Sequence, residues 1–186
     1  MDNAWDDHWA TPPVDNKWPV YTRILQLIQE KQRAGSSSVC VLDAGCGRGG
    51  LLDSIRQAPG VSAVGFDGSA VAVQKCKARL LTVGAARLEA FDLVGDGFDV
   101  VVASDLLDCL DDPAAGVGRL VSLARSGGLV VVSLPIGQEV DYPQTCRPTG
   151  PEVGAWLADA GAPKIQVEDV VYRDRVLRSL FVARRI

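Results

Sequence analysis

The stretch Val39–Gly50, which reads VCVLDAGCGRGG, constrains this chain more than any other part of it. Apolar residues lead into Asp43, and four glycines follow closely behind. A short apolar run that ends at glycines is typical of a buried strand followed by a sharp turn. Glycine adopts positive φ angles and leaves no side chain between the backbone and a ligand. Leu51, Leu52 and Ile55 then have helical spacing, so the sequence predicts the strand, glycine loop and helix that receive a nucleotide-like cofactor.

Charge and cysteine content exclude several classes of protein. The net charge of −4 at pH 7 gives no support for nucleic acid as the main partner, since domains that bind it usually carry a basic face. The chain has five cysteines, an odd number, and no two of them are spaced as C-x-x-C. This argues against a disulfide framework and against a zinc site. The acidic N-terminus is no signal peptide, and no apolar run is long enough to cross a membrane. We therefore expect one cytoplasmic domain.

The first 35 residues differ in composition from the rest of the chain. Trp5, Trp9 and Trp18 lie among acidic residues, together with His8, in a sequence otherwise poor in aromatic residues. Two compatible interpretations remain open: an arm packed on the domain surface, and a lid whose rings cover a ligand pocket. A helix is predicted from Pro19 onwards, because proline suits a first helical position and an apolar face follows it.

We accordingly divide the chain into an N-terminal aromatic arm and helix, residues 1–35, and a domain that spans residues 36–186. Within the domain, residues 61–66 read as a second strand, and Asp67 stands at its end, 22 residues after Gly45. An acid at this distance and position is placed to accept hydrogen bonds from both hydroxyls of a ribose. Its alternative role is the N-cap of the next helix, although Ser69 could supply that cap instead.

The remaining periodicity predicts alternating helices and strands followed by a hairpin. We expect strands at 86–91, 98–105 and 129–135, with helices at 70–80, 113–125 and from Thr149 to Ala160. The last two strands, 165–172 and 176–183, are joined by a short turn and must therefore be antiparallel. Arginines gather here, and we expect them on a solvated strand edge rather than in a binding patch; they are Arg173, Arg175, Arg178, Arg184 and Arg185.

The glycine motif fits two patterns. Gly45-x-Gly47-x-x-Gly50 satisfies the dinucleotide fingerprint, which alone is weak. Asp43 followed by Gly45-x-Gly47-x-Gly49 resembles the first motif of the class I S-adenosylmethionine-dependent methyltransferases. The terminal hairpin is also similar to the sheet ending of that class. The resemblance implies an α/β fold of the Rossmann-like, doubly wound type, with a mostly parallel seven-stranded sheet and a C-terminal antiparallel hairpin.

The same resemblance implies S-adenosyl-L-methionine as cofactor and assigns residues to it. An acid after the third strand would accept the adenine amino group and the next backbone N–H would meet the ring, which points to Asp92 and Leu93. Glu89 is a rival in the same segment, and the alternative role of Asp92 is that of a turn residue. Ser104 and Asp105, at the tip of the fourth strand, would face the methionine part of the cofactor or the acceptor. The implied cofactor set is Asp43, Gly45, Cys46, Gly47, Gly49, Asp67, Gly68, Asp92, Leu93, Ser104 and Tyr21.

The catalytic residues are less defined. Many relatives carry a Glu-His or His-His pair where this chain has Asp108-Cys109, so no histidine base is implied there. Methyl transfer from a sulfonium is an in-line displacement in which positioning of the nucleophile supplies much of the rate. A hydroxyl acceptor would benefit from a general base, for which the candidates are His8, Asp105 and Asp108.

The function that these patterns favour is methyl transfer to an oxygen or nitrogen atom of a small-molecule acceptor. Similarity to a methionine-biosynthesis methyltransferase-like group, in which members act with a partner, leaves a second hypothesis: a cofactor-binding partner or sensor protein without turnover. A nicotinamide-dinucleotide-binding protein is supported only by the formal glycine fingerprint. A homodimer or a protein partner is compatible with each of these.

Overall fold

The computed structural model describes residues 3–11, 19–35, 38–92, 95–135, 140, 142–172 and 175–186. In chain order its helices, strands and 3₁₀ turns are α1 (Asn3–Ala10), α2 (Pro19–Arg33), β1 (Val39–Ala44), α3 (Gly50–Ile55), β2 (Val61–Asp67), α4 (Ala70–Ala78), β3 (Val83–Ala85), η1 (Leu88–Ala90), β4 (Phe98–Ser104), η2 (Leu107–Cys109), α5 (Pro113–Leu123), β5 (Ala124–Leu134), α6 (Gly150–Asp159), β6 (Lys164–Tyr172) and β7 (Arg175–Arg184).

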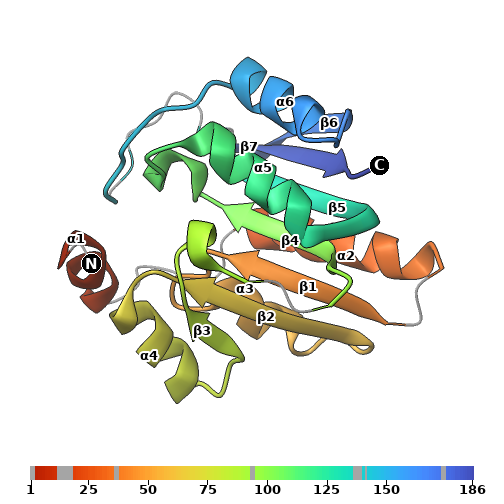
Figure 1. Cartoon of the computed structure of the whole chain (residues 1–186). Coiled ribbons are helices and arrows are strands. Elements are labelled where there is room, and N and C mark those ends of the chain that lie inside the picture. The colour runs from red at the N-terminus through yellow and green to blue at the C-terminus, as the bar shows by residue number, and fades with distance from the viewer. Residues whose placement is uncertain are drawn as a thin grey trace.

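A single seven-stranded sheet organises these elements, in the order β3-β2-β1-β4-β5-β7-β6 (Figure 1). The pairs among β1 to β5 are parallel, whereas β7 runs antiparallel to both β5 and β6. Because β1 lies between β2 and β4, the chain reverses its winding direction beside the glycine loop, at the point where open α/β sheets bind ligands. The expected fold class is therefore confirmed, including the terminal hairpin.

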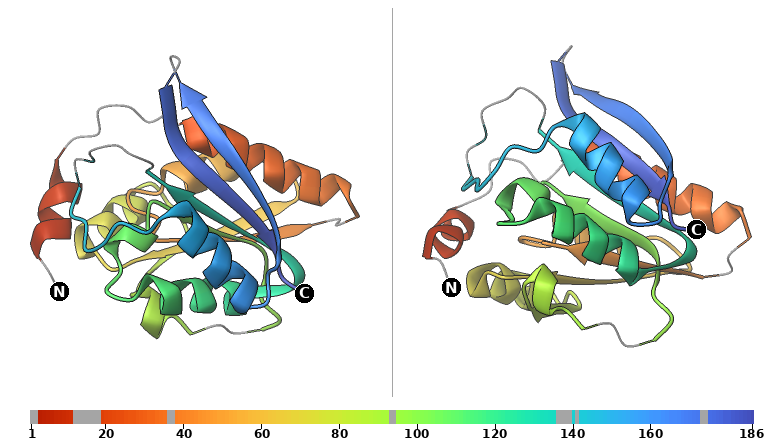
Figure 2. Two further views of the ribbon diagram at one scale, coloured as in Figure 1. Left: turned by 90° about the horizontal axis from the view of Figure 1, so that it is seen from above. Right: turned by 45° about the horizontal axis from the view of Figure 1, so that its top comes forward.

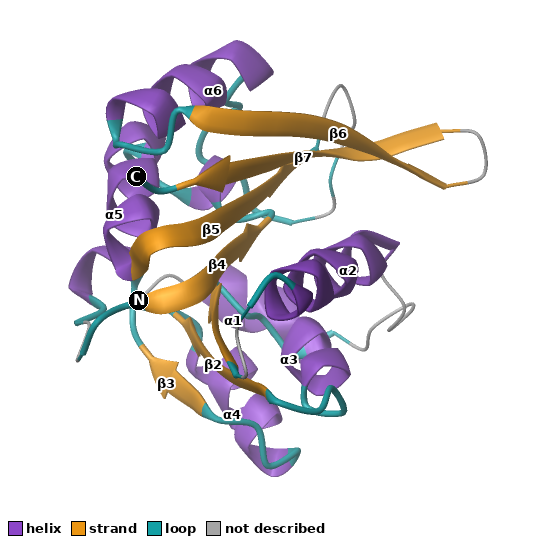
Figure 3. Cartoon of the chain, turned by 90° about the vertical axis from the view of Figure 1, so that its right-hand side faces the viewer, coloured by secondary structure: helices purple, strands orange, loops and turns teal. Residues whose placement is uncertain are grey.

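Two layers of helices cover the sheet, one on each face (Figure 3). On one face the apolar side of α2 packs with α3 against the central strands, through residues such as Ile24 and Ile55. On the opposite face α5 and α6 pack against the same strands, through residues such as Leu120 and Leu157. The central strands are apolar on both sides because both sides are covered, which is the usual pattern of a buried parallel sheet.

The third strand was predicted at 86–91 but lies at Val83–Ala85, and the segment after it forms the η1 turn. The residues Ala-Arg-Leu-Glu-Ala that enter this segment favour helical over extended backbone, which explains the error. Its apolar residues are still used: Leu88 is buried in the core, and the ring of Phe91 stacks on Phe66 with centroids 4.4 Å apart.

The N-terminal segment forms a helix, α1, that was not predicted. It lies beyond the carboxyl ends of the parallel strands, next to α4 and the segment that precedes α6 (Figures 1 and 2). The guanidinium of Arg48 donates to the carbonyls of His8 and Trp9, and the Lys75 ammonium donates to those of Trp9 and Ala10. These cations satisfy the last carbonyls of the helix. No helix in the described part of the chain is long and apolar enough to cross a membrane.

Candidate active site

The glycine loop follows β1 and turns with little room for side chains. Gly45 and Gly47 have φ angles of 69° and 51°, which side chains rarely adopt. A Cβ atom on Gly47 would lie 2.6 Å from the indole ring of Trp9, and one on Gly45 would lie 2.8 Å from Leu106 Cδ1. The loop is therefore bare backbone over which α1 places an aromatic ring.

Asp67 fixes this loop to the end of β2. Its Oδ2 accepts the backbone N–H of Gly47 at 2.8 Å, and its Oδ1 accepts the backbone N–H of Ser69, also at 2.8 Å. Each oxygen keeps a further lone pair for a hydroxyl donor. The helix cap is a different residue, since Ser69 Oγ accepts the backbone N–H of Ala72. Burial raises the pKa of Asp67, and the two N–H donors oppose that shift.

Asp43 lies beneath the loop, with 3% of its surface exposed. Burial, with smaller contributions from Cys76 and Asp67, raises its pKa to about 8. Tyr21 on α2 closes the same corner, because a Cβ atom on Gly50 would lie 2.9 Å from its ring. Burial, followed by the charge of Asp43, also raises the pKa of the Tyr21 phenol.

A second polar group stands at the ends of β4 and β5. Arg178 Nε donates to Asp105 Oδ1 at 2.9 Å and to Oδ2 at 2.8 Å. Ser133 Oγ donates to Asp105 Oδ1 at 2.8 Å and lies 3.1 Å from Ser104 Oγ. Burial raises the pKa of Asp105, and the Arg178 guanidinium opposes that shift. Asp105 adopts a φ of 53°, an uncommon backbone conformation that its neighbours hold in place.

Asp108 anchors the segment that leads to α6. Its carboxyl group is buried, and Oδ2 accepts hydrogen bonds from Tyr142 Oη at 2.8 Å and Gln144 Nε2 at 2.7 Å. Its backbone carbonyl accepts the N–H groups of Thr145 and Cys146. Burial raises the pKa of the Tyr142 phenol, and the charges of Asp105 and Asp108 add to the shift.

Four rings meet between α1 and that segment, and we call them the aromatic cluster: Trp5, His8, Trp9 and Tyr142. The Trp5 ring stacks on Trp9 and Tyr142, with centroids 6.0 and 6.1 Å apart. The His8 ring meets the edge of Trp9 at 4.6 Å and of Tyr142 at 6.3 Å. Asp6, on the same helix, accepts hydrogen bonds from Ser69 Oγ and the Val71 N–H at the start of α4.

The structure thus gathers most of the predicted residues at the carboxyl edge of the sheet, including His8, which is 97 positions from Asp105. Cys46 is buried within the loop, and Gly68 is exposed directly after β2. Asp92 is exposed after η1, and Leu93 lies outside the described residues.

Sequence reasoning missed three contributors to the site: Arg178, Ser133 and Tyr142. The expectation that Arg178 lies on a solvated edge is wrong, because it is 5% exposed and bound to Asp105. The signal was its place in the apolar run of β7, where an isolated arginine must find a carboxylate. Tyr142 and Ser133 carried no comparable signal.

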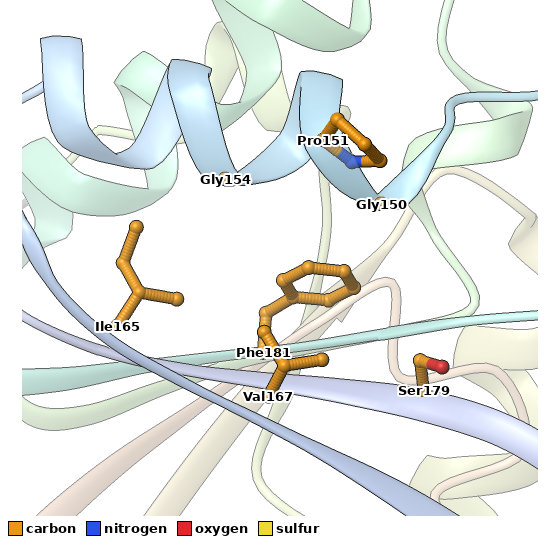
Figure 4. A pocket seen from close by; sticks show the side chains of 7 residues that line it. All are labelled: Gly150, Pro151, Gly154, Ile165, Val167, Ser179 and Phe181. Carbon is orange, nitrogen blue, oxygen red and sulfur yellow. The ribbon is translucent and has the colours of Figure 1, made fainter.

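A groove of about 490 Å³ lies elsewhere, between α6 and the β6–β7 hairpin (Figure 4). Gly150, Pro151 and Gly154 form its helical side, and Ile165, Val167 and Phe181 lie opposite. Ser179 is the one polar side chain among these lining residues, and its hydroxyl donates to Asp169 Oδ1 at 2.6 Å.

Comparison with known proteins bears on this geometry. A family model described as a methyltransferase domain matches residues 42–130. The chain is 29% identical over 197 aligned residues to a ubiquinone biosynthesis O-methyltransferase of Pseudomonas paraeruginosa, covering 90% of this chain and 79% of that protein.

Two solved structures share the fold. Magnesium protoporphyrin IX methyltransferase from Synechocystis PCC 6803 superposes with a TM-score of 0.73 at 18% identity, covering 99% of this chain and 94% of the other. The CurJ carbon methyltransferase superposes with a TM-score of 0.74 at 15% identity, covering 88% and 53%. Together with the sheet order and the glycine loop, these similarities support a class I S-adenosylmethionine-dependent methyltransferase.

Proposed function

We propose that this enzyme transfers the methyl group of S-adenosylmethionine to an oxygen or nitrogen atom of a small-molecule acceptor, at the carboxyl edge between the glycine loop and the aromatic cluster. The observation that carries the proposal is the geometry of Asp67. Both of its oxygens are fixed by backbone N–H groups, one of them from Gly47, and both retain lone pairs for ribose hydroxyls.

The other residues around the loop fit the same cofactor. Gly45, Gly47 and Gly49 bring no side chain to the loop surface, and the Cys46 side chain between them packs into the core, which leaves the loop backbone for the cofactor. Asp43 and Tyr21, beneath and beside the loop, are assigned to the methionine end together with Ser104. Gly68, Asp92 and Leu93 are assigned to the adenosine end. Gly68 follows β2 and Asp92 follows η1, whereas Leu93 lies outside the described residues.

S-adenosylmethionine supplies an electrophilic methyl group on a sulfonium whose departure leaves a neutral thioether. The chain's residues have to hold the acceptor in line and exclude water. The Asp105 carboxylate is bound to Arg178, and Asp108 Oδ2 already accepts two hydrogen bonds. We therefore assign these two aspartates to positioning. The His8 imidazole, partly exposed in the aromatic cluster, is the candidate base that takes a proton from a hydroxyl acceptor.

The sequence predicts a lid within residues 1–35, and we propose that only α1 acts as this lid. The apolar face of α2 forms part of the core, with Val20 and Ile24 fully buried, and cannot open without unfolding it. Helix α1 instead lies over the loop and is held at its end by Arg48 and Lys75. A peripheral helix that packs outside the main core suits a segment that opens for ligand entry.

Calorimetric titration with S-adenosylhomocysteine tests the proposal. We expect the parent protein to bind and Asp67→Ala to lose about 1–3 kcal/mol of binding free energy, because the Gly47 N–H and the ribose hydroxyls lose their acceptor. Asp159→Ala, at an exposed carboxylate of α6, is the matched control and should bind as the parent does. Equal affinity in Asp67→Ala would contradict the assignment, and binding of NAD instead would favour the dinucleotide alternative.

Turnover separates an enzyme from a cofactor-binding partner protein. With a hydroxyl acceptor, His8→Gln should lower the rate of methyl transfer while the affinity for S-adenosylhomocysteine stays the same. Transfer that is insensitive to His8 would remove it as the base, and methylation found at carbon would overturn the oxygen or nitrogen assignment.

A further inference from the structure

The aromatic cluster is larger than the attachment of α1 requires. Polar contacts already hold this helix: Asp6 binds the start of α4, and Arg48 and Lys75 bind its last carbonyls. The four rings are nevertheless all partly exposed at the edge where the acceptor must bind. Partly exposed rings that converge on a site are a typical binding surface, since they offer large apolar faces at little cost in side-chain entropy.

Trp9 adds an unsatisfied donor to this surface. Its indole Nε1 is buried and has no hydrogen-bond partner among the described residues, although its ring lies directly over Gly47. A buried donor without an acceptor is unfavourable, and such groups in native structures usually await a ligand or a water. The ring system therefore has a polar requirement as well as an apolar one, as expected for a ring-shaped ligand that carries a heteroatom.

The charges around the cluster do not favour an anion. The carboxylates of Asp6, Asp67 and Asp108 adjoin its residues. Two cations adjoin it as well: the Arg48 guanidinium lies 5.4 Å from the centre of the Trp9 ring, and Lys75 binds the Trp9 carbonyl. Arg178 forms its ion pair with Asp105. Three carboxylates against two cations leave the surroundings of the cluster with a net negative charge, so a carboxylate or phosphate acceptor gains no net electrostatic attraction here.

Resting on the proposed function, we propose that the aromatic cluster is the acceptor subsite and that it takes an uncharged planar aromatic molecule bearing a hydroxyl or amine. Trp5 lies at its centre, because it stacks on both Trp9 and Tyr142 and so joins α1 to the segment anchored on Asp108. The acceptor ring packs against the exposed parts of these rings with its polar atom near His8, and it reaches the buried Trp9 N–H as α1 moves to admit it.

Three matched probes test the proposal on the full chain saturated with S-adenosylhomocysteine, by calorimetry. Naphthol is planar and neutral, decahydronaphthol has the same hydroxyl without aromaticity, and naphthoate is planar but anionic. We expect naphthol to bind at least about tenfold more tightly than either of the others, because only naphthol combines stacking with neutrality.

Variants then locate the site. Trp5→Ala should weaken naphthol at least about tenfold, and Trp5→Phe should retain most of the affinity, since a phenyl ring still stacks. Trp156→Phe on α6 is the control for loss of an indole and should change nothing. The affinity for S-adenosylhomocysteine, measured in each variant, reports whether the cofactor site is intact.

The two proposals fail differently. If the parent binds S-adenosylhomocysteine but naphthol and decahydronaphthol bind equally, or Trp5→Ala leaves naphthol unaffected, the acceptor subsite is overturned and the proposed function stands. If naphthoate binds as tightly as naphthol, the requirement for an uncharged acceptor is overturned. If the parent does not bind S-adenosylhomocysteine, both proposals fall together.

Discussion

At the scale of single residues, the fold destabilises the charged form of one carboxyl group in the site, that of Asp43. Asp43 is almost completely buried at the end of β1, and burial raises its pKa to about 8. In the unfolded chain the same carboxyl titrates near the ordinary aspartate value of about 4. The residue therefore costs stability at neutral pH, which is common for groups that serve a binding site.

We expect the stability contribution of Asp43 to fall as pH rises. Between the unfolded and folded pKa values the native state binds the extra proton, so the free energy of unfolding decreases across that window and levels off above pH 8. Asp43→Asn removes this titration. The stability of the variant relative to the parent should rise by roughly 2–4 kcal/mol between pH 5 and pH 8.5.

Urea unfolding of the parent and of Asp43→Asn at both pH values measures this change in relative stability. Any effect of the asparagine side chain that does not depend on pH cancels in the comparison. A stability difference that does not change with pH would show that the Asp43 carboxyl titrates normally in the folded protein.

At the scale of elements, α1 is the part of the molecule whose attachment is most open to change. It packs beside α4 rather than into the main core, and Asp6 connects it to the first turn of α4 through Ser69 Oγ and the Val71 N–H. A carboxylate that accepts N–H groups at the start of a helix interacts favourably with the helix dipole. These hydrogen bonds lower the pKa of Asp6, so the contact is present above that pKa and is lost as pH falls through it.

We expect Asp6→Ala to loosen α1 without unfolding the domain. Amide hydrogen exchange in residues 3–11 should accelerate, and S-adenosylhomocysteine should dissociate severalfold faster, because the lid opens more often. The matched control is Asp7→Ala, a neighbouring exposed acid on the same helix. Equal exchange and dissociation in the two variants would contradict a specific contact of Asp6 and a role of α1 as a lid.

At the scale of the whole molecule, a buried ion pair joins the C-terminal hairpin to the carboxyl edge of the parallel strands. Arg178 in β7 reaches over the end of β5 to Asp105, which follows β4 and is 73 residues away in sequence. Both side chains lie in the interior, with 6% and 16% of their surfaces exposed. Removing one partner of such a pair leaves a buried charge without compensation, which is costly.

We expect Arg178→Met to lower the free energy of unfolding by about 3–5 kcal/mol. Asp105→Asn should cost less, because asparagine tolerates the positive φ of that position and keeps part of the hydrogen bonding. In the double variant the losses should be well below additive, since neither charge then remains alone. Urea denaturation of the four proteins completes the cycle, and strictly additive losses would show that the two side chains are not coupled.

The sequence alone predicts most of the architecture and the glycine loop proposed to bind the cofactor. The apolar run before Asp43, the glycines behind it and the position of Asp67 are local signals, and each describes backbone geometry that neighbouring residues set by themselves. The hairpin was predictable for the same reason, since a short turn between two strands permits only antiparallel pairing. The third strand was misplaced because a segment of helix-favouring residues surrounds two apolar side chains that the core requires.

The tertiary structure alone decided what surrounds the loop. Helix α1 is short and lacks a strong local signal, so only its contacts with Arg48, Lys75 and Ser69 place it at the edge of the sheet. The aromatic cluster likewise forms only when the chain folds. So do the hydrogen bonds that Asp105 and Asp108 accept from Ser133, Tyr142 and Arg178, which lie 28 to 73 positions away in sequence. Local sequence sets backbone conformation, whereas contacts between distant side chains depend on how strands and helices pack, and that information exists only in the folded chain.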